Sequence, residues 1–356
     1  MNPKVTVVLT SYNHGPFLRQ AIDSVLNQTF TDWECLIWDD VSSDDSWEII
    51  QSYDDPRIIP IRNEQTRRYI YAINTSITER ARGEYIAVHH SDDAWAPEKL
   101  ERQVAFLDAN PETAAVFSYV QIIDEQNNQL DNDWFNLPNK SRQEWLHSLF
   151  FNVNRLCHPS VLSRKSIYSE IGLYKLFHGQ TDDAEMWTRL LKKAEIHIVP
   201  ERLTLHRVST VGATVSSDSP QTRARLRFEW FEQKRNYLDF SVEELLEIFP
   251  DMSKWQAENG KSDPHYMLAM YAIHQGNSQN TGLFGLDLLY TLLNTPKRVD
   301  EIAVNHGFTY LDFIKISGRE ELFFHTDMPI QEATLRMVLG RKSPAWLRKL
   351  ARPFLK

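Results

Sequence analysis

The sequence predicts an α/β fold, in which a mostly parallel sheet is flanked by helices and a helical region follows at the C-terminal end. Through about residue 215, short apolar segments rich in β-branched residues alternate with segments whose apolar residues recur at helical spacing. An acidic pair directly follows two of the apolar segments. Beyond residue 222 only the helical spacing persists, as in Leu286, Leu289 and Leu293.

The first strands are predicted from continuous apolar runs, which are typical of parallel strands buried on both faces. Residues 5–10, Val-Thr-Val-Val-Leu-Thr, form the first run, and residues 11–16 break it as a loop. Gly83 is expected to cap the helix that precedes the fourth strand. In chain order, we expect a strand at 5–10, a helix through 18–26, a strand at 36–38, a helix that includes 49–50, a strand at 57–61, a helix at 71–82 and a strand that begins at 84.

The same alternation continues to residue 215. We expect a helix that starts near Pro97, a strand at 114–123, strands near 160 and 196, and a helix from Ala184 between these last two. A polar, proline-containing stretch at 216–221 reads as a boundary. The predicted domains are therefore an α/β domain at 1–215 and a helical C-terminal region at 222–356, which ends in a basic amphipathic tail at 341–356.

Composition and charge restrict the class of function. The 356 residues are 42% hydrophobic and 24% charged, as in a soluble globular protein, and the formal net charge of -9 argues against general nucleic-acid binding. Two cysteines, Cys35 and Cys157, cannot build a disulfide framework, and Cys35 is expected to be a buried thiol. We find no run of 18 apolar residues and no signal peptide, so we expect a soluble cytoplasmic protein.

The acidic pairs Asp39-Asp40 and Asp92-Asp93 are the strongest functional signal. Ligands of an open parallel sheet bind at the carboxyl ends of its strands, and four carboxylates there would repel one another unless a cation or hydrogen-bond donors met them. A nucleoside diphosphate with a divalent metal, Mg²⁺ or Mn²⁺, supplies both. Asp40 could accept the imide hydrogen of uracil or thymine, and Tyr12 could stack on that base.

Each pair also has a structural interpretation, because Asp is common where strands end and where helices begin. A response-regulator receiver places acids on such an edge too, but we find no convincing phosphoacceptor and lysine at later strand ends. A third acidic segment, residues 181–189, could likewise be a capped helix start. It could instead supply the general base that a displacement by an acceptor hydroxyl requires, from Asp182, Asp183 or Glu185.

Five segments together resemble the family 2 glycosyltransferases, in the same order along the chain. They lie at residues 7–13, 21–30, 39–40, 83–87 and 91–100, and the similarity covers roughly the first 215 residues. The resemblance implies a Rossmann-like GT-A fold, a UDP- or dTDP-sugar donor, a divalent metal and inversion at the anomeric carbon. It divides the first domain into a nucleotide-sugar half at about 1–125 and an acceptor half at about 126–215.

The resemblance also implies roles for particular residues. On this analogy Asp183 is the catalytic base and Asp93 binds the metal. The donor-binding residues are Thr10, Tyr12, Asp40, Arg68, Asn74 and Asp92. Within this set Asp40 and Tyr12 hold the base, Asp92 contacts the ribose side, and the segment that contains Arg68 and Asn74 lines the nucleotide pocket.

Two features depart from the family pattern. His90 stands where the family often has an additional Asp, two residues before Asp92, so the Asp-x-Asp signature is incomplete. His89 and His90 could ligate metal, but we expect packing roles for both. Residues 65–69 replace a glycine-rich stretch, and Arg67 or Arg68 could contact the diphosphate there. His158 and His206 match segments near the acceptor and the metal or phosphate in relatives; for both we favour a structural role.

The C-terminal tail at 341–356 carries six basic residues and no acid in an otherwise acidic protein, together with apolar residues such as Trp346 and Phe354. Such a segment can bind an anionic membrane surface, or remain solvated, or dock on an acidic face. We therefore expect a protein that is cytoplasmic, with peripheral contact to the inner face of the membrane as one possibility. The expected acceptor is a surface glycan or a lipid-linked saccharide.

Two other functions are compatible with an α/β pattern. A non-catalytic nucleotide-sugar-binding or scaffold protein of the same fold is one alternative, because of His90. A dinucleotide-dependent oxidoreductase is the other. That alternative is weakened because residues 10–15, Thr-Ser-Tyr-Asn-His-Gly, follow the first strand in place of Gly-x-Gly-x-x-Gly.

Overall fold

The computed structural model describes residues 2–208, 219–319 and 322–323. By its internal contacts the chain divides after Tyr237 into two compact units. Among the described residues, no helix is long and apolar enough to cross a membrane.

The first unit is built around an eight-stranded sheet in the order β3-β2-β1-β4-β7-β6-β8-β5. Strands β3, β2, β1 and β4 are parallel to one another, and β6 is parallel to β8. Strand β7 pairs antiparallel with β4 and β6, and β5 pairs antiparallel with β8. This mixed, mostly parallel sheet confirms the predicted fold class. The strands are β1 Val5–Ser11, β2 Trp33–Asp39, β3 Ile58–Arg62, β4 Tyr85–His90, β5 Ala94–Trp95, β6 Thr113–Ile123, β7 Leu162–Arg164 and β8 Glu195–Arg207.

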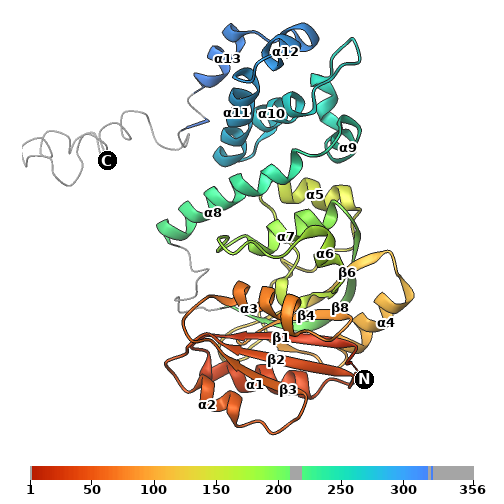
Figure 1. Ribbon diagram of the computed structural model, residues 1–356, viewed down its shortest axis with the longest axis vertical. Helices are drawn as coiled ribbons and strands as arrows, with labels where there is room; N and C mark the ends of the chain where they lie inside the picture. Colours follow the sequence, from red (N-terminus) through yellow and green to blue (C-terminus); the bar gives the residue numbers. More distant parts are fainter. Residues whose placement is uncertain (1, 209–218, 320–321, 324–356) are drawn as a thin grey trace, which may run out of the picture. The chain divides into compact units, whose positions relative to one another are not determined.

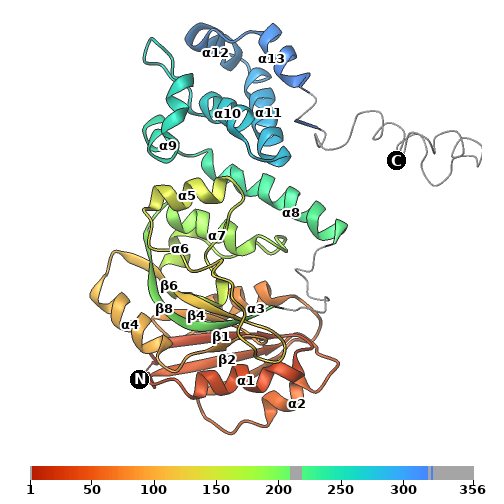
Figure 2. The ribbon, with the colours of Figure 1, turned by 180° about the vertical axis from the view of Figure 1, so that it is seen from behind.

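Helices cover both faces of this sheet. Figures 1 and 2 show α1 and α2 on one face of the parallel strands and α3 on the other. Buried side chains of β1, such as Val7 and Leu9, belong to one core with Leu18 and Ile22 of α1, which accounts for the apolar residues on this face of the strand. The helices are α1 Gly15–Leu26, α2 Ser46–Gln51, α3 Tyr69–Thr75, α4 Lys99–Ala109, α5 Arg142–Phe150, α6 Ile167–Ile171, α7 Asp182–Leu191 and α8 Pro220–Gln233.

Gly83 does not cap a helix, in contrast to the expectation. Helix α3 continues as a π-helical turn at Ser76–Arg80, and Ala81 is already extended. Gly83 does not have a positive φ, so its backbone conformation does not require glycine. A Cβ at this position, however, would lie 2.4 Å from the Thr6 nitrogen and 2.7 Å from the Val5 carbonyl carbon. The glycine is therefore required because the chain passes directly against the backbone of β1.

The second unit is helical in its described part, as predicted. Its helices are α9 Val242–Ile248, α10 Pro264–Gln275, α11 Gln279–Leu293, α12 Arg298–His306 and α13 Tyr310–Ser317. Asp263 accepts hydrogen bonds from the backbone of His265 and Tyr266 and so caps α10. The polar stretch at 216–221 does not coincide with the division between the units, because α8 belongs to the first. The basic tail at 341–356 lies outside the described residues.

Candidate active site

The carboxyl ends of β1, β2 and β4 lie at one edge of the sheet, which we call the acidic rim. Ser11 pairs with Asp39, and Thr10 pairs with His90. The Asp40 N–H donates to the Ser11 carbonyl at 2.9 Å, and the Ser91 N–H donates to the Thr10 carbonyl at 3.2 Å. The two acidic pairs, far apart in the sequence, are thus brought together at the point where the strand order reverses around β1.

Asp40 organises the loop that leads into α3. Its carboxylate accepts hydrogen bonds from the side chain of Asn63 at 2.7 Å and from the backbone N–H groups of Arg67 and Arg68 at 2.8 and 2.9 Å. A carboxylate offers about four acceptor positions, so one position is left for a ligand. Its partner Asp39 is fully buried and holds Arg62 and the Ser42 N–H, which is a structural role in the turn.

Three non-glycine residues at the acidic rim have positive φ: Asn13 at 53°, Val41 at 65° and Arg68 at 68°. For a β-branched residue such as Val41 this conformation is a genuine outlier. Strain of this kind persists where surrounding contacts fix it, and it is common at ligand sites. Tyr12, in the loop after β1, is 51% exposed and so is accessible to a stacked base, whereas Thr10 is buried.

His90, Asp92 and Asp93 form a group that could hold a metal ion, since one ligand atom from each lies within 4.8 Å of the others. The Asp93 Oδ2 atom and the His90 Nε2 atom are buried and make no hydrogen bond to the described residues, although Asp93 Oδ2 lies 3.7 Å from His90 Nδ1. Two orphaned ligand atoms beside a half-buried carboxylate fit a divalent cation. His90 occupies the sequence position of the missing carboxylate of the Asp-x-Asp signature, two residues before Asp92, and it belongs to this group. His89 instead stacks on Trp95, in agreement with the packing role expected for it.

The end of β8 holds Asp93 in place. The Asp93 Oδ1 atom accepts hydrogen bonds from His206 Nδ1 at 2.9 Å and from the Arg207 N–H at 2.8 Å. Burial raises the pKa of Asp93, but His206, His90 and these hydrogen bonds outweigh it and bring the pKa to about 2. Arg207 also donates to the Asp92 carbonyl. His206 and Arg207 therefore both hold Asp93, which belongs to the group that could hold a metal ion.

Asp183 lies at the start of α7, on the acceptor half. Its carboxylate accepts hydrogen bonds from the Asn154 side chain at 2.8 Å and from the Ala184 N–H at 2.7 Å. Burial and the neighbouring charge of Asp182 raise the pKa of Asp183 to about 8. Asp182 accepts a hydrogen bond from the Tyr69 hydroxyl at 2.6 Å, and Glu185 is paired with Lys175 and Arg189. Burial also raises the pKa of Asp182, to about 6, so these two adjacent aspartates, unlike the ion-paired Glu185, both have pKa values closer to neutral than an ordinary Asp.

Arg68 and Asn74 connect the nucleotide half to the acceptor half. The Arg68 guanidinium is exposed and donates to the Gly179 carbonyl at 3.3 Å. The Asn74 amide exchanges two hydrogen bonds with the backbone of Tyr174, at 2.8 and 3.0 Å. His158 is buried, and its Nε2 atom lies 3.1 Å from the Tyr174 hydroxyl, in agreement with a structural role. The sequence did not single out Asn154, in a loop, or Tyr69, at the start of α3, because a single polar residue carries no pattern.

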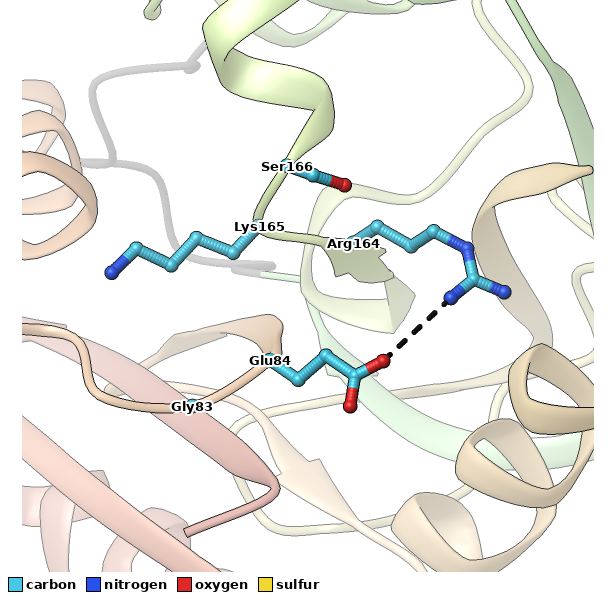
Figure 3. Close-up of a pocket in the computed structure, with 5 residues that line it drawn as sticks. All are labelled: Gly83, Glu84, Arg164, Lys165 and Ser166. Atoms are coloured by element: carbon cyan, nitrogen blue, oxygen red, sulfur yellow. Dashed lines mark ion pairs between the residues drawn. The ribbon is translucent and has the colours of Figure 1, made fainter. Parts of the chain in front are cut away.

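A separate pocket of about 370 Å³ lies at the opposite end of β4, where the strand begins. It is lined by Gly83, Glu84, Arg164, Lys165 and Ser166 (Figure 3). Arg164 pairs with Glu84, as the dashed line in Figure 3 marks, and Lys165 donates to the Ala81 carbonyl. The charged groups of this pocket are therefore occupied by the protein itself, and it is distinct from the acidic rim.

Comparison with known proteins identifies the family. The model of Glycosyl transferase family 2 matches residues 6–172. The uncharacterized glycosyltransferase MJ1057 of Methanocaldococcus jannaschii is 32% identical over 212 residues, which cover 58% of this chain and 71% of MJ1057. The Escherichia coli enzyme WfaP, named as a UDP-Glc:alpha-D-GlcNAc-diphosphoundecaprenol beta-1,3-glucosyltransferase, is 36% identical over 113 residues, 32% of this chain and 43% of WfaP.

Solved structures agree with this assignment at the level of the fold. The crystal structure of S. aureus TarS 1-349 in complex with UDP-GlcNAc superimposes with a TM-score of 0.56 at 14% identity, over 84% of this chain and 83% of that one. The predicted resemblance is therefore confirmed. The chain belongs to glycosyl transferase family 2, the inverting glycosyltransferases of GT-A fold that use nucleotide sugars.

Proposed function

We propose that this protein transfers a sugar from a UDP- or dTDP-sugar to an acceptor hydroxyl, with the donor diphosphate at the acidic rim and Asp183 as general base. The observation that carries the proposal is the pair of orphaned buried atoms, Asp93 Oδ2 and His90 Nε2, at the meeting point of the two acidic pairs. A buried polar atom without a hydrogen-bond partner is costly, and a bound ion or water is one way to satisfy it.

The residues around this point divide the work of donor binding. Asp93, His90 and Asp92 would hold a divalent cation, Mn²⁺ or Mg²⁺, which when bound offsets the charge of the leaving diphosphate. Asp40 accepts the imide hydrogen of the base, and Tyr12 stacks on it. Arg68, with its guanidinium exposed beside the rim, is available to the phosphates.

Asp183 removes the acceptor proton as the hydroxyl attacks the anomeric carbon. The hydrogen bonds from Asn154 and the Ala184 N–H fix the direction of the carboxylate. The raised pKa makes the carboxylate a stronger base than an ordinary Asp while still leaving it ionised in a useful fraction of molecules near neutral pH. The resemblance to the family assigns this role to Asp183 and not to its neighbour Asp182, which accepts a hydrogen bond from Tyr69.

The acceptor we propose is a growing surface glycan or a lipid-linked saccharide, at the cytoplasmic face of a membrane. WfaP, by its name, acts on a diphosphoundecaprenol-linked sugar. The basic, apolar sequence at 341–356 supports peripheral contact with an anionic membrane surface.

The test is a transfer assay with labelled UDP- and dTDP-sugars and a bacterial lipid-linked saccharide fraction as acceptor. We expect label to enter the acceptor with the wild type, and at least 100-fold less with Asp183→Asn, on the scale typical of general base catalysis. A wild type that binds UDP but transfers no more than Asp183→Asn would instead support the non-catalytic alternative.

A further inference from the structure

Glu229 of α8 is a buried carboxylate directed at the backbone just before α7. It is 2% exposed. One oxygen accepts the N–H of Gly179 at 2.8 Å, and the other accepts the N–H groups of Gln180 at 2.8 Å and Thr181 at 2.9 Å, with the Thr181 hydroxyl at 3.3 Å. Three successive N–H groups thus converge on one carboxylate, which offsets the cost of burying its charge.

The segment 179–181, here named the base loop, leads directly into the proposed catalytic residue. Thr181 is the N-terminal cap residue of α7, but its side chain makes no capping hydrogen bond, and Asp183 is the second residue of the helix. Glu229 therefore holds, from another helix, the N–H groups of the three residues that lead into α7. The direction of the Asp183 carboxylate depends on backbone that Glu229 holds.

The base loop is also tied to the nucleotide side of the site. Gly179 donates its N–H to Glu229, and its carbonyl accepts a hydrogen bond from the Arg68 guanidinium. The Arg68 N–H in turn is held by Asp40. A Cβ on Gly179 would lie 3.1 Å from the Arg68 guanidinium nitrogens, so the peptide is tightly enclosed. One chain of hydrogen bonds therefore runs from Asp40, the proposed partner of the nucleobase, through Arg68 and Gly179 to Glu229.

Helix α8 is attached along the length of α7 and not only at its start. Gln233 donates to the Thr188 hydroxyl, and Asn236, just after α8, donates to Glu185 at 3.3 Å. These contacts keep α8 in a fixed position relative to α7, which Glu229 needs if it is to define the base loop to within the fraction of an ångström that a catalytic geometry requires.

We propose that Glu229 is a positioning residue for sugar transfer: by holding the base loop, it directs the Asp183 carboxylate at the acceptor hydroxyl. This inference rests on the proposed role of Asp183. Glu229 does not touch the reacting atoms; it acts through residues 179–181. Misplacement of a catalytic group by about 1 Å can cost on the order of 100-fold in rate, so loss of these hydrogen bonds is expected to lower kcat rather than donor affinity.

The experiment compares Glu229→Gln with Glu232→Gln, a matched change on the same helix, where Glu232 pairs only with nearby Arg235 among the ion pairs of the described residues. For Glu229→Gln we expect kcat for transfer to fall at least 10-fold, donor KM to stay within twofold, and hydrogen exchange at residues 179–181 to accelerate. Glu232→Gln should change none of these. Should Glu229→Gln fail to fold, Glu229→Asp keeps the charge, withdraws it from the base loop, and should show the same loss of kcat.

A folded Glu229→Gln or Glu229→Asp with wild-type kcat would overturn the inference, as would an equal loss in Glu232→Gln. The Asp183→Asn variant separates failure of the role of Glu229 from failure of the proposed function. If Asp183→Asn is inactive while Glu229→Gln behaves as wild type, only the role of Glu229 fails. If the wild type and Asp183→Asn are equally inactive, the proposed function fails, and the role of Glu229 fails with it.

Discussion

Asp183 combines a half-buried carboxylate with an acidic neighbour, Asp182, whose oxygen is already engaged by Tyr69. Burial of the charge and repulsion from Asp182 both favour the protonated form. We expect the ionised form of Asp183 to lower the free energy of unfolding, because this charge is stabilised less in the folded chain than in water.

Replacement of Asp183 by Asn should therefore raise stability at high pH. The folded-state pKa of about 8 lies above the ordinary value for Asp, so the folded chain holds this proton more tightly than the unfolded chain does. The corresponding stability is complete below about pH 4 and is lost as pH rises through about 8. We expect the Tm of Asp183→Asn to exceed that of the wild type at pH 9, with a smaller difference at pH 5. An equal difference at both pH values would contradict the assigned environment.

The sequence was sufficient to predict a site at the two acidic pairs, because a pair of acids directly after each of two apolar strands is a recognisable pattern. Their convergence follows from parallel strand geometry. Glu229 could not be predicted, because a Glu in a helix with seven other charged or polar residues resembles a solvent-facing residue. Its burial becomes visible only once α8 is placed against the loop before α7. Both Asp183 and Glu229 also lie beyond residues 6–172, which the family model matches.

At the scale of elements, β1, β2 and β4 were predicted closely because each is buried on both faces and has a continuous apolar run at its centre. Helix ends were predicted less well. The end of α3 was placed at Gly83 because glycine often follows a helix, whereas the structure uses this glycine for close contact with β1. Close approach between segments 77 residues apart depends on tertiary packing and leaves no local signal.

Gly83→Ala tests this interpretation. The added methyl group would meet backbone atoms of Thr6 and Val5 at 2.4 and 2.7 Å, and backbone in the central strand cannot move aside cheaply. We expect a loss of about 1–3 kcal/mol, the range for overpacked sites, measured as a lower urea midpoint. The methyl group would displace the backbone at the start of β1 and β4, which is the end of these strands opposite the acidic rim. A variant with an unchanged midpoint would show that the contact can relax.

At the scale of the whole molecule, charge is unevenly distributed along the chain. The net charge is -9, yet residues 341–356 contain six basic residues and no acid. A protein of this overall charge would be repelled by an anionic membrane unless such a segment overcame the repulsion, at about 1 kcal/mol for each basic residue near the lipid.

Deletion of the residues after Gly340 should therefore abolish binding to vesicles that contain anionic lipid, as measured by co-sedimentation. The full chain should bind such vesicles, and less so at high salt, because surface charge is screened. Vesicles of neutral lipid serve as the control. Equal binding by the full and shortened chains would refute the proposed role of the tail.

The most direct test of the central claim, that the acidic rim binds a nucleoside diphosphate with a metal, is a thermal-shift measurement with UDP and dTDP, each with and without Mn²⁺. A ligand that binds only the folded state raises Tm by mass action. We predict a metal-dependent rise for UDP or dTDP in the wild type that is lost in Asp93→Asn, which keeps the shape of the side chain but removes a charged ligand. No response to either diphosphate, or a rise with NAD alone, would contradict the account.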